Sequence, residues 1–397
     1  MKIKLLAIVV LFTQQLAAQS YKKIHDKAIV VDTHNDILMK ATDDDATNHG
    51  INVLVFDKDL TGKTHSDLAR WKTGGLDVQL FSVFCDGKMI NPYQYANRQM
   101  DTLDAVAARN PDKIVKVANT AALLKAVQQH KLAAMFGVEG GHMIEDDLNK
   151  LDVLYKRGAR YMTLTWNNST SWATSAFDET FTKNLAHKGL TDFGKQVVKR
   201  MNDLGMLVDV SHVGEQTFWD VIATTTKPII ASHSSVYNLC HHQRNLKDDQ
   251  IRAIAKNGGV VQLNFNPGFI DSSFAKKETD FFQRHKEEKD SLTKTGMSDW
   301  NVQDYLYKKY ADETNSMRPP LSMLIQHIEY IINLVGVDYV GLGSDFDGIN
   351  LTPLQLDDVT SYPLITKALV EKGYSKKDIT KILGGNFLRV LKANETK

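Results

Sequence analysis

Residues 28–36 read AIVVDTHND, an apolar run that ends in a cluster of polar side chains. Runs of this kind recur along the chain. They are short, rich in Val, Ile, Leu and Phe, and lack strict alternation, which is typical of buried parallel strands. Eight of them are found, at residues 28–33, 78–84, 133–138, 160–165, 206–210, 228–231, 259–264 and 339–343. The sequence therefore predicts eight strands of a parallel sheet.

Amphipathic stretches with the helical period lie between most of these runs. They cover residues 102–108, 120–130, 147–157, 191–204, 216–224, 247–256 and 321–334. Eight strands that alternate with helices favour a closed (β/α)8 barrel over an open sheet. We therefore predict an α/β fold, a TIM-like (β/α)8 barrel of the metal-dependent amidohydrolase type, with insertions at its active face.

Length and composition narrow the class of protein. The 397 residues fit one large barrel with insertions, or two domains. With 48 basic and 47 acidic residues, the chain has no basic excess that would point to nucleic acid. Its two cysteines, Cys85 and Cys240, exclude a disulfide framework and a cysteine-based zinc module. Whether these two cysteines pair with each other is left open.

The N-terminus has the features of an export signal. Residues 1–20 read MKIKLLAIVVLFTQQLAAQS, with Lys2 and Lys4 before an apolar stretch and small residues before the expected cleavage site. The apolar stretch, residues 5–12, is too short to span a bilayer. We predict that residues 1–18 are a cleaved signal peptide. Residues 19–397 would then form a single catalytic domain, exported to the periplasm or secreted, soluble and without a stable membrane anchor.

Two insertions interrupt the strand and helix alternation. The first, at about residues 37–77, separates the first two strands, and the second lies at about residues 267–320. The second contains the charged stretch 276–294, which we interpret as a solvated helix. Because loops after barrel strands lie at the active face, this second insertion is also a candidate lid.

Polar side chains with metal-binding capacity follow five of the predicted strands. A barrel brings the C-terminal ends of all its strands to one face, so these side chains should converge. Three imidazoles with carboxylates and no thiolate suit zinc or a similar cation. Because the set exceeds the needs of one tetrahedral ion, a bridged pair of ions explains it better, with the two Glu139 oxygens as the bridge. The converging residues are His34, Asp36, Glu139, His212, His233 and Asp345.

Other polar residues at the strand ends fit the position but not the ligand pattern. We interpret Asp32, Asp209 and Asp347 as residues that support ligands or turns. His142 can be either a ligand or a supporting hydrogen-bond donor, and the sequence does not decide between these roles.

The strand-end motifs resemble those of the membrane dipeptidase (renal dipeptidase) family, the zinc dipeptidases of the M19 type. The motifs occur in the order of that family and span nearly all of the chain. They are DTHND at 32–36, GVEGGH at 137–142, SHSS at 232–235, RN at 244–245 and GSDFDG at 343–348. The resemblance implies a metal-dependent barrel that cleaves free dipeptides and tolerates a D-residue at the C-terminal position.

The resemblance also implies a ligand set. His34 and Asp36 would bind one Zn²⁺, and His212 and His233 would bind a second. Glu139 would bridge the two ions together with a water or hydroxide, and thereby contribute to catalysis. The same resemblance favours a homodimer.

Two further roles follow from the resemblance. Arg244 matches the arginine that binds the free carboxylate of the substrate, a group for which a planar guanidinium is well suited. Asp345 matches the catalytic acid/base aspartate, which also contacts the substrate.

One position departs from the family pattern. Residues 163–166 read Thr-Leu-Thr-Trp, whereas the family carries Thr-Leu-Thr-His. An indole N–H donates one hydrogen bond but cannot carry a proton or charge. Trp166 therefore substitutes as a neutral donor to the substrate, reshapes the pocket, or reduces activity, and the sequence leaves these three readings open.

Two alternatives to a dipeptidase remain at this stage. One is another amidohydrolase with two metal ions, such as a lactonase or another small amide or ester hydrolase; these commonly bridge their metals through a modified lysine, and no strand-end lysine is present here. The other is a non-catalytic peptide-binding relative, which Trp166 favours and the intact Asp345 disfavours.

Overall fold

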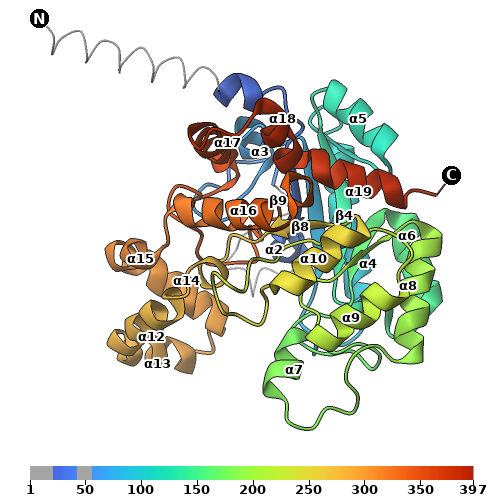
Figure 1. Cartoon of the computed structure of the whole chain (residues 1–397). Coiled ribbons are helices and arrows are strands. Elements are labelled where there is room, and N and C mark those ends of the chain that lie inside the picture. The colour runs from blue at the N-terminus through green and yellow to red at the C-terminus, as the bar shows by residue number, and fades with distance from the viewer. Residues whose placement is uncertain (1–20, 43–55, 397) are drawn as a thin grey trace, which may run out of the picture.

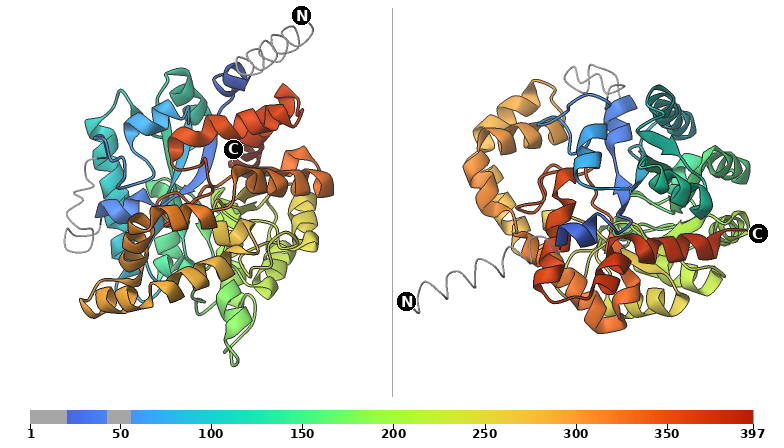
Figure 2. Two further views of the ribbon diagram at one scale, coloured as in Figure 1. Left: turned by 90° about the vertical axis from the view of Figure 1, so that its left-hand side faces the viewer. Right: turned by 90° about the horizontal axis from the view of Figure 1, so that it is seen from above.

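A barrel of eight parallel strands forms the centre of the molecule (Figure 1). The computed structural model describes residues 21–42 and 56–396. The barrel strands pair in the order β1-β2-β4-β5-β6-β7-β8-β9, and helices surround them in a ring (Figure 2). Their bounds are β1 Val31–Asn35, β2 Val78–Phe84, β4 Leu132–Glu139, β5 Ala159–Thr163, β6 Leu207–Asp209, β7 Ile230–Ala231, β8 Val260–Leu263 and β9 Val340–Leu342. The predicted (β/α)8 fold is confirmed.

The barrel approaches closure between the first strand and the segment that follows the last. A parallel bridge joins Asn35 to Phe346, and the Asp345 amide donates to the His34 carbonyl at 3.1 Å. The buried Asp32 carboxylate accepts hydrogen bonds from the backbone and hydroxyl of Ser344, a residue 312 positions away. These contacts bring the motif of β1 next to the motif after β9.

One strand is missing from the sequence prediction. β3 (Ile114–Lys116) lies outside the barrel and pairs only with β4. Its three residues form too short an apolar run to be separated from a loop by periodicity. Within the described residues the sheet therefore has nine strands rather than eight, although the barrel itself keeps eight.

The helices match the predicted amphipathic stretches closely, except that the first begins ten residues earlier, at Pro92. They are α4 Pro92–Arg109, α5 Thr120–Gln128, α6 Leu148–Arg157, α8 Asp192–Leu204, α9 Glu215–Thr224, α10 Asp248–Asn257 and α16 Leu321–Val335. The C-terminal part adds α17 Tyr362–Glu371, α18 Lys376–Thr380 and α19 Asn386–Asn394. α19 buries Phe387, Val390 and Leu391 against residues at the start of the strands, such as Val31 and Val78.

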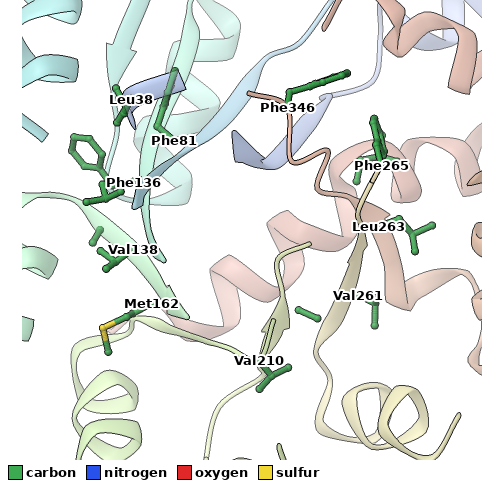
Figure 3. Close-up of a cluster of buried hydrophobic side chains, with 14 of the residues drawn as sticks. Leu38, Phe81, Phe136, Val138, Met162, Val210, Val261, Leu263, Phe265 and Phe346 are labelled. Carbon is green, nitrogen blue, oxygen red and sulfur yellow. The ribbon is translucent and has the colours of Figure 1, made fainter. Parts of the chain in front are cut away.

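The main hydrophobic core lies between the strands and the surrounding helices. Phe81, Phe136 and Met162 project from β2, β4 and β5, and Val261 and Leu263 from β8 (Figure 3). All five side chains are buried. Burial of such apolar area is the main stabilising term, about 25 cal/mol per Å². It holds rigid the strands whose ends carry the polar motifs.

The second insertion forms a helical group with a core of its own, seen at the lower left of Figure 1. It contains α11 Pro267–Ile270, α12 Phe274–Arg284, α13 Lys286–Lys294, α14 Asp299–Lys309 and α15 Ala311–Met317. Its buried cluster comprises Phe274, Phe281, Val302, Leu306, Tyr307 and Met317. The charged stretch 276–294, predicted to be one solvated helix, forms most of α12 and all of α13. α13 buries no residue, as a solvated helix should, whereas α12 buries Phe281 in the core of the insertion, so the prediction is wrong for the first half of the stretch.

The first insertion is described in part: α2 (Ile37–Thr42) and α3 (Leu68–Thr73) belong to it. A further short helix, α7 (Ala176–Phe181), follows β5. The predicted signal peptide, residues 1–18, lies outside the described residues. Among the helices of the described part, none has the length and apolar character needed to cross a membrane.

Candidate metal centre and active site

Three candidate histidine ligands surround the carboxylate of Glu139, the last residue of β4. Its Oε2 lies 3.2 Å from Nε2 of His34. Its Oε1 lies 2.8 Å from Nε2 of His212 and 3.5 Å from Nε2 of His233. Nε2 of His34 also lies 3.3 Å from Oδ2 of Asp36. The two oxygens of one carboxylate thus face two different groups of candidate ligands.

The fold positions each ligand at the end of a barrel strand. His34 lies within β1, and Asp36 follows two residues later on the same side of the extended chain. His212 follows β6 and adopts φ +64°, a left-handed conformation that non-glycine residues rarely adopt. His233 follows β7. The predicted convergence of these residues at the carboxyl end of the barrel is therefore present.

A tyrosine fixes the tautomer of His34. The Tyr161 hydroxyl donates to the Thr33 carbonyl at 3.0 Å and lies 2.7 Å from Nδ1 of His34. Because the single hydroxyl proton is used on Thr33, Nδ1 of His34 must be the donor in the second contact. Nε2 then keeps a free lone pair, and it has no hydrogen-bond partner in the described structure.

Hydrogen bonds also fix the tautomers of His212 and His233. Nδ1 of His212 lies 3.1 Å from Oδ1 of Asn167, an acceptor, so Nδ1 carries the proton. Nδ1 of His233 lies 2.7 Å from the Ser232 hydroxyl, which itself donates to Asp209 at 2.6 Å. Ser232 therefore accepts the proton of His233. In both rings Nε2 is left with a lone pair that points toward Glu139.

These donors fit a divalent cation. The Nε2 atoms of His212 and His233 lie only 3.0 Å apart. Burial lowers the pKa of His212 to about 3 and that of His233 well below its ordinary value, so both rings are neutral. Two lone pairs this close, beside a buried carboxylate, are costly unless a cation lies between them. Neutral imidazoles and carboxylates are the donors that zinc prefers.

The pKa of His34 also indicates a site for a cation. Burial alone would lower it, but Tyr161, Asp36 and Glu139 together hold it well above 6.5. The position therefore attracts positive charge, whether proton or metal ion. The described ligand atoms fall into two compatible groups, one of His34, Glu139 and His233, and one of His34, Asp36 and Asp345.

Asp345 lies beside Asp36 in a turn that a glycine makes possible. Burial, followed by the negative charge of Asp36, raises the pKa of Asp345 to about 8. Oδ2 of Asp345 accepts a hydrogen bond from the Asn264 amide at 2.9 Å, and its φ is +63°. A Cβ atom at Gly348 would lie 2.1 Å from Oδ2 of Asp36 and 2.5 Å from Oδ1 of Asp345, so only glycine fits.

Arg244 is a buried cation with unused donors. One guanidinium nitrogen donates to the His233 carbonyl at 3.2 Å, while Nε and Nη1 are buried without a partner in the described structure. Burial lowers its pKa to about 10, so it remains charged at neutral pH. Arg244 and His212 line a cavity of about 400 Å³. This arrangement can accept a carboxylate next to the candidate metal centre.

Trp166 lies at the edge of the same centre. Its half-buried ring packs 4.9 Å from the ring of Phe84 and 6.4 Å from that of His212. His142 is not part of either ligand group; its Nε2 lies 3.1 Å from the Cys85 carbonyl. Cys85 and Cys240 do not form a disulfide with each other.

The supporting aspartates have the roles that the sequence suggested. Asp209 orients His233 through Ser232, and Asp347 accepts from the backbone of His65 and from Lys40. The sequence reasoning missed Tyr161 and Asn264. Each lies inside a strand run or at its end, and its partner lies far away in the chain.

Comparisons with known proteins identify the family of this chain. The chain matches the model of the membrane dipeptidase family, peptidase family M19, over residues 18–397. It is 33% identical over 400 residues to an uncharacterized dipeptidase of Schizosaccharomyces pombe, covering 96% of this chain and 84% of that protein.

Solved structures share the fold. The probable dipeptidase PvdM from Pseudomonas aeruginosa has a TM-score of 0.75 at 23% identity, covering 96% of this chain and 98% of that one. A metallo peptidase from Rhodobacter sphaeroides, liganded with a phosphinate mimic of the dipeptide L-Ala-D-Ala, has a TM-score of 0.74 at 22% identity, covering 93% and 100%. The family match over nearly the whole chain and the relative at 33% identity together place this protein in the membrane dipeptidase family, M19.

Proposed function

We propose that this metallo-dipeptidase holds two zinc ions and hydrolyses free dipeptides outside the cytoplasm. The observation that carries the proposal is the arrangement of three Nε2 lone pairs around Glu139, whose two oxygens face different histidines. His34 and Asp36 would hold one ion, His212 and His233 the other, with Glu139 between them. When bound, such ions lower the pKa of a coordinated water and polarise a carbonyl group.

The protein's own residues would move the proton and orient the substrate. Oδ1 of Asp345 is the free oxygen of that carboxylate, because Oδ2 is bonded to Asn264. We assign to it the transfer of a proton from the attacking water to the leaving amine. Positive charge beside Asp36 counteracts the raised pKa of Asp345, which brings it toward the range useful for an acid/base group.

Arg244 would set the length of the substrate. Its two unpartnered nitrogens are suited to the free carboxylate of a C-terminal residue. A site that requires this carboxylate close to the scissile bond accepts a dipeptide and excludes a protein chain. The L-Ala-D-Ala mimic bound by the Rhodobacter sphaeroides relative supports testing substrates with a C-terminal D-residue.

Further parts of the proposal come from the sequence. The pattern of residues 1–18 favours export, with residues 19–397 acting as one catalytic domain. A homodimer is an expectation from the family resemblance alone. A non-catalytic peptide-binding role remains the second candidate, because Trp166 stands where the family has a histidine.

Hydrolysis of L,L- and L,D-dipeptides by the purified protein tests the proposal. The assay is run with and without added zinc, and with an N-acylated, C-amidated peptide as control. We expect zinc-dependent cleavage of the free dipeptides alone, and a raised KM for Arg244→Ala. A protein that holds two zinc ions but cleaves no dipeptide would favour the peptide-binding role. Cleavage of the blocked control would contradict the assignment of Arg244 as the residue that binds the substrate carboxylate.

A further inference from the structure

A second, smaller cavity lies between the helical insertion and the segment that follows β9. Its volume is about 130 Å³, and its lining includes Gly348 on one side and Glu278, Trp300 and Tyr307 of the insertion on the other. Gly348 is also the residue whose missing side chain makes room for Asp36 and Asp345. One wall of this cavity is therefore the backbone that contacts the candidate acid/base carboxylate.

The two cavities lie toward different groups of the site. Arg244 and His212 line the 400 Å³ cavity, and neither lines the smaller one. If Arg244 binds the C-terminal carboxylate of a dipeptide, the C-terminal residue lies on the side of the larger cavity. The N-terminal residue then lies across the scissile bond, on the side of Asp345 and Gly348, where the smaller cavity begins.

Glu278 gives the smaller cavity a distinct chemistry. It lies on α12 and accepts a hydrogen bond at Oε1 from the Tyr307 hydroxyl at 2.6 Å. Among the described residues it has no ion-pair partner, and Lys289 acts on it only from a distance. Burial raises the pKa of Glu278 by more than the Tyr307 hydrogen bond and Lys289 lower it, so the charge of this carboxylate is only partly compensated. A cation entering the cavity would complete that compensation.

We propose that the smaller cavity is the subsite for the N-terminal side chain of the substrate, and that Glu278 selects a basic side chain such as lysine. The proposal rests on the proposed dipeptidase function and names its substrate class. The cavity has Glu278 and Trp300 in its lining, so the ammonium of a lysine side chain can meet the carboxylate while its methylene groups lie along the indole ring.

The test compares two phosphinate analogues of dipeptides that differ only in charge at the N-terminal side chain. One carries the lysine side chain and the other the uncharged norleucine side chain, each followed by alanine. Affinity is measured by calorimetry with the zinc-loaded enzyme. Because binding is the readout, the result does not depend on turnover. The test variant is Glu278→Gln, and the matched control is Glu288→Gln on α13. Glu288 also accepts a hydrogen bond from a tyrosine hydroxyl, that of Tyr310 at 2.7 Å, but it does not line the cavity.

We expect the lysine analogue to bind wild type roughly tenfold to a hundredfold more tightly than the norleucine analogue, as for a charge-assisted hydrogen bond. Glu278→Gln should abolish this preference without changing norleucine binding, which also shows that the variant is folded. Glu288→Gln should keep the preference for the lysine analogue. Equal binding of both analogues by wild type, or a preference that survives Glu278→Gln, overturns the proposal. Failure of the dipeptidase function itself would instead appear as absence of turnover with every dipeptide.

Discussion

Replacing Gly348 by alanine should damage the metal centre without disturbing the barrel. The new Cβ would lie 2.1 Å from Oδ2 of Asp36 and 2.5 Å from Oδ1 of Asp345. Carbon and oxygen atoms at ordinary contact are about 3.4 Å apart, so the Asp36 carboxylate must retreat by about 1 Å. Asp36 is nearly fully buried and cannot swing into solvent to avoid the clash.

The expected magnitude follows from the tolerance of metal sites. Ligand distances hold within about ±0.2 Å, so a shift of about 1 Å removes Asp36 as an effective ligand. A misplacement of this size costs on the order of 10²-fold in rate, or about 2.7 kcal/mol. We therefore expect Gly348→Ala to lose one of two zinc equivalents and to lower kcat/KM by about 10²-fold.

Zinc content is measured by elemental analysis after dialysis against a weak chelator, and kcat/KM with an L,L-dipeptide. The control is Gly385→Ala, immediately before α19, where the nearest atom to a new Cβ is a backbone oxygen at 3.2 Å. Two zinc equivalents and unchanged kcat/KM in Gly348→Ala would refute the assignment of Asp36 as a ligand. Equal losses in both variants would attribute the effect to the fold rather than to the site.

Four other outcomes are expected. Asp345→Asn should lower kcat by about 10²- to 10⁴-fold with zinc content unchanged, and loss of zinc would contradict its acid/base role. Trp166→Phe should lower kcat/KM about tenfold through loss of the indole N–H. Unchanged kinetics would show that the indole N–H does not bind the substrate and that the ring only lines the site. Tyr161→Phe should weaken zinc affinity about 10- to 100-fold in chelator competition, since Nδ1 of His34 loses its acceptor; equal affinity would contradict this. Burial raises the pKa of Asp77 to about 6, so its ionisation destabilises the folded chain progressively as the pH rises from about 4 to 6. Asp77→Asn should therefore unfold at a higher temperature than wild type above pH 6 and at the same temperature near pH 3, with a gain of at most about 3 kcal/mol, and a gain independent of pH would exclude ionisation as the cause.

The barrel was predictable because its strands are buried on both faces. Such strands read as uninterrupted apolar runs, and their polar ends mark the active face directly. β3 was not predictable, since among the described strands Ile114–Lys116 pairs with β4 alone and three residues carry no period. The separate core of the insertion was also missed, because Phe281 and Tyr307 come from helices whose charged residues dominate the pattern.

The convergence of the candidate ligands was predictable, but the residues that orient them were not. His34 and Asp36 lie two residues apart in one motif, and that spacing is visible in the sequence. The contact between Tyr161 and His34 joins residues 127 positions apart, and nothing local marks that tyrosine. The contact of His142 with Cys85 was likewise unreadable, because it depends on how two loops fold together.

The hydrogen bonds between the two ends of the barrel have a consequence for the order of assembly. Asp32 and Ser344 are separated by 312 residues, and the same contact brings Asp36 next to Asp345. A growing polypeptide cannot complete this half of the centre until synthesis has passed residue 348. Capture of the ion assigned to His34 and Asp36 would therefore be a late event in the life of each new chain, whereas the residues assigned to the other ion are all made by residue 233.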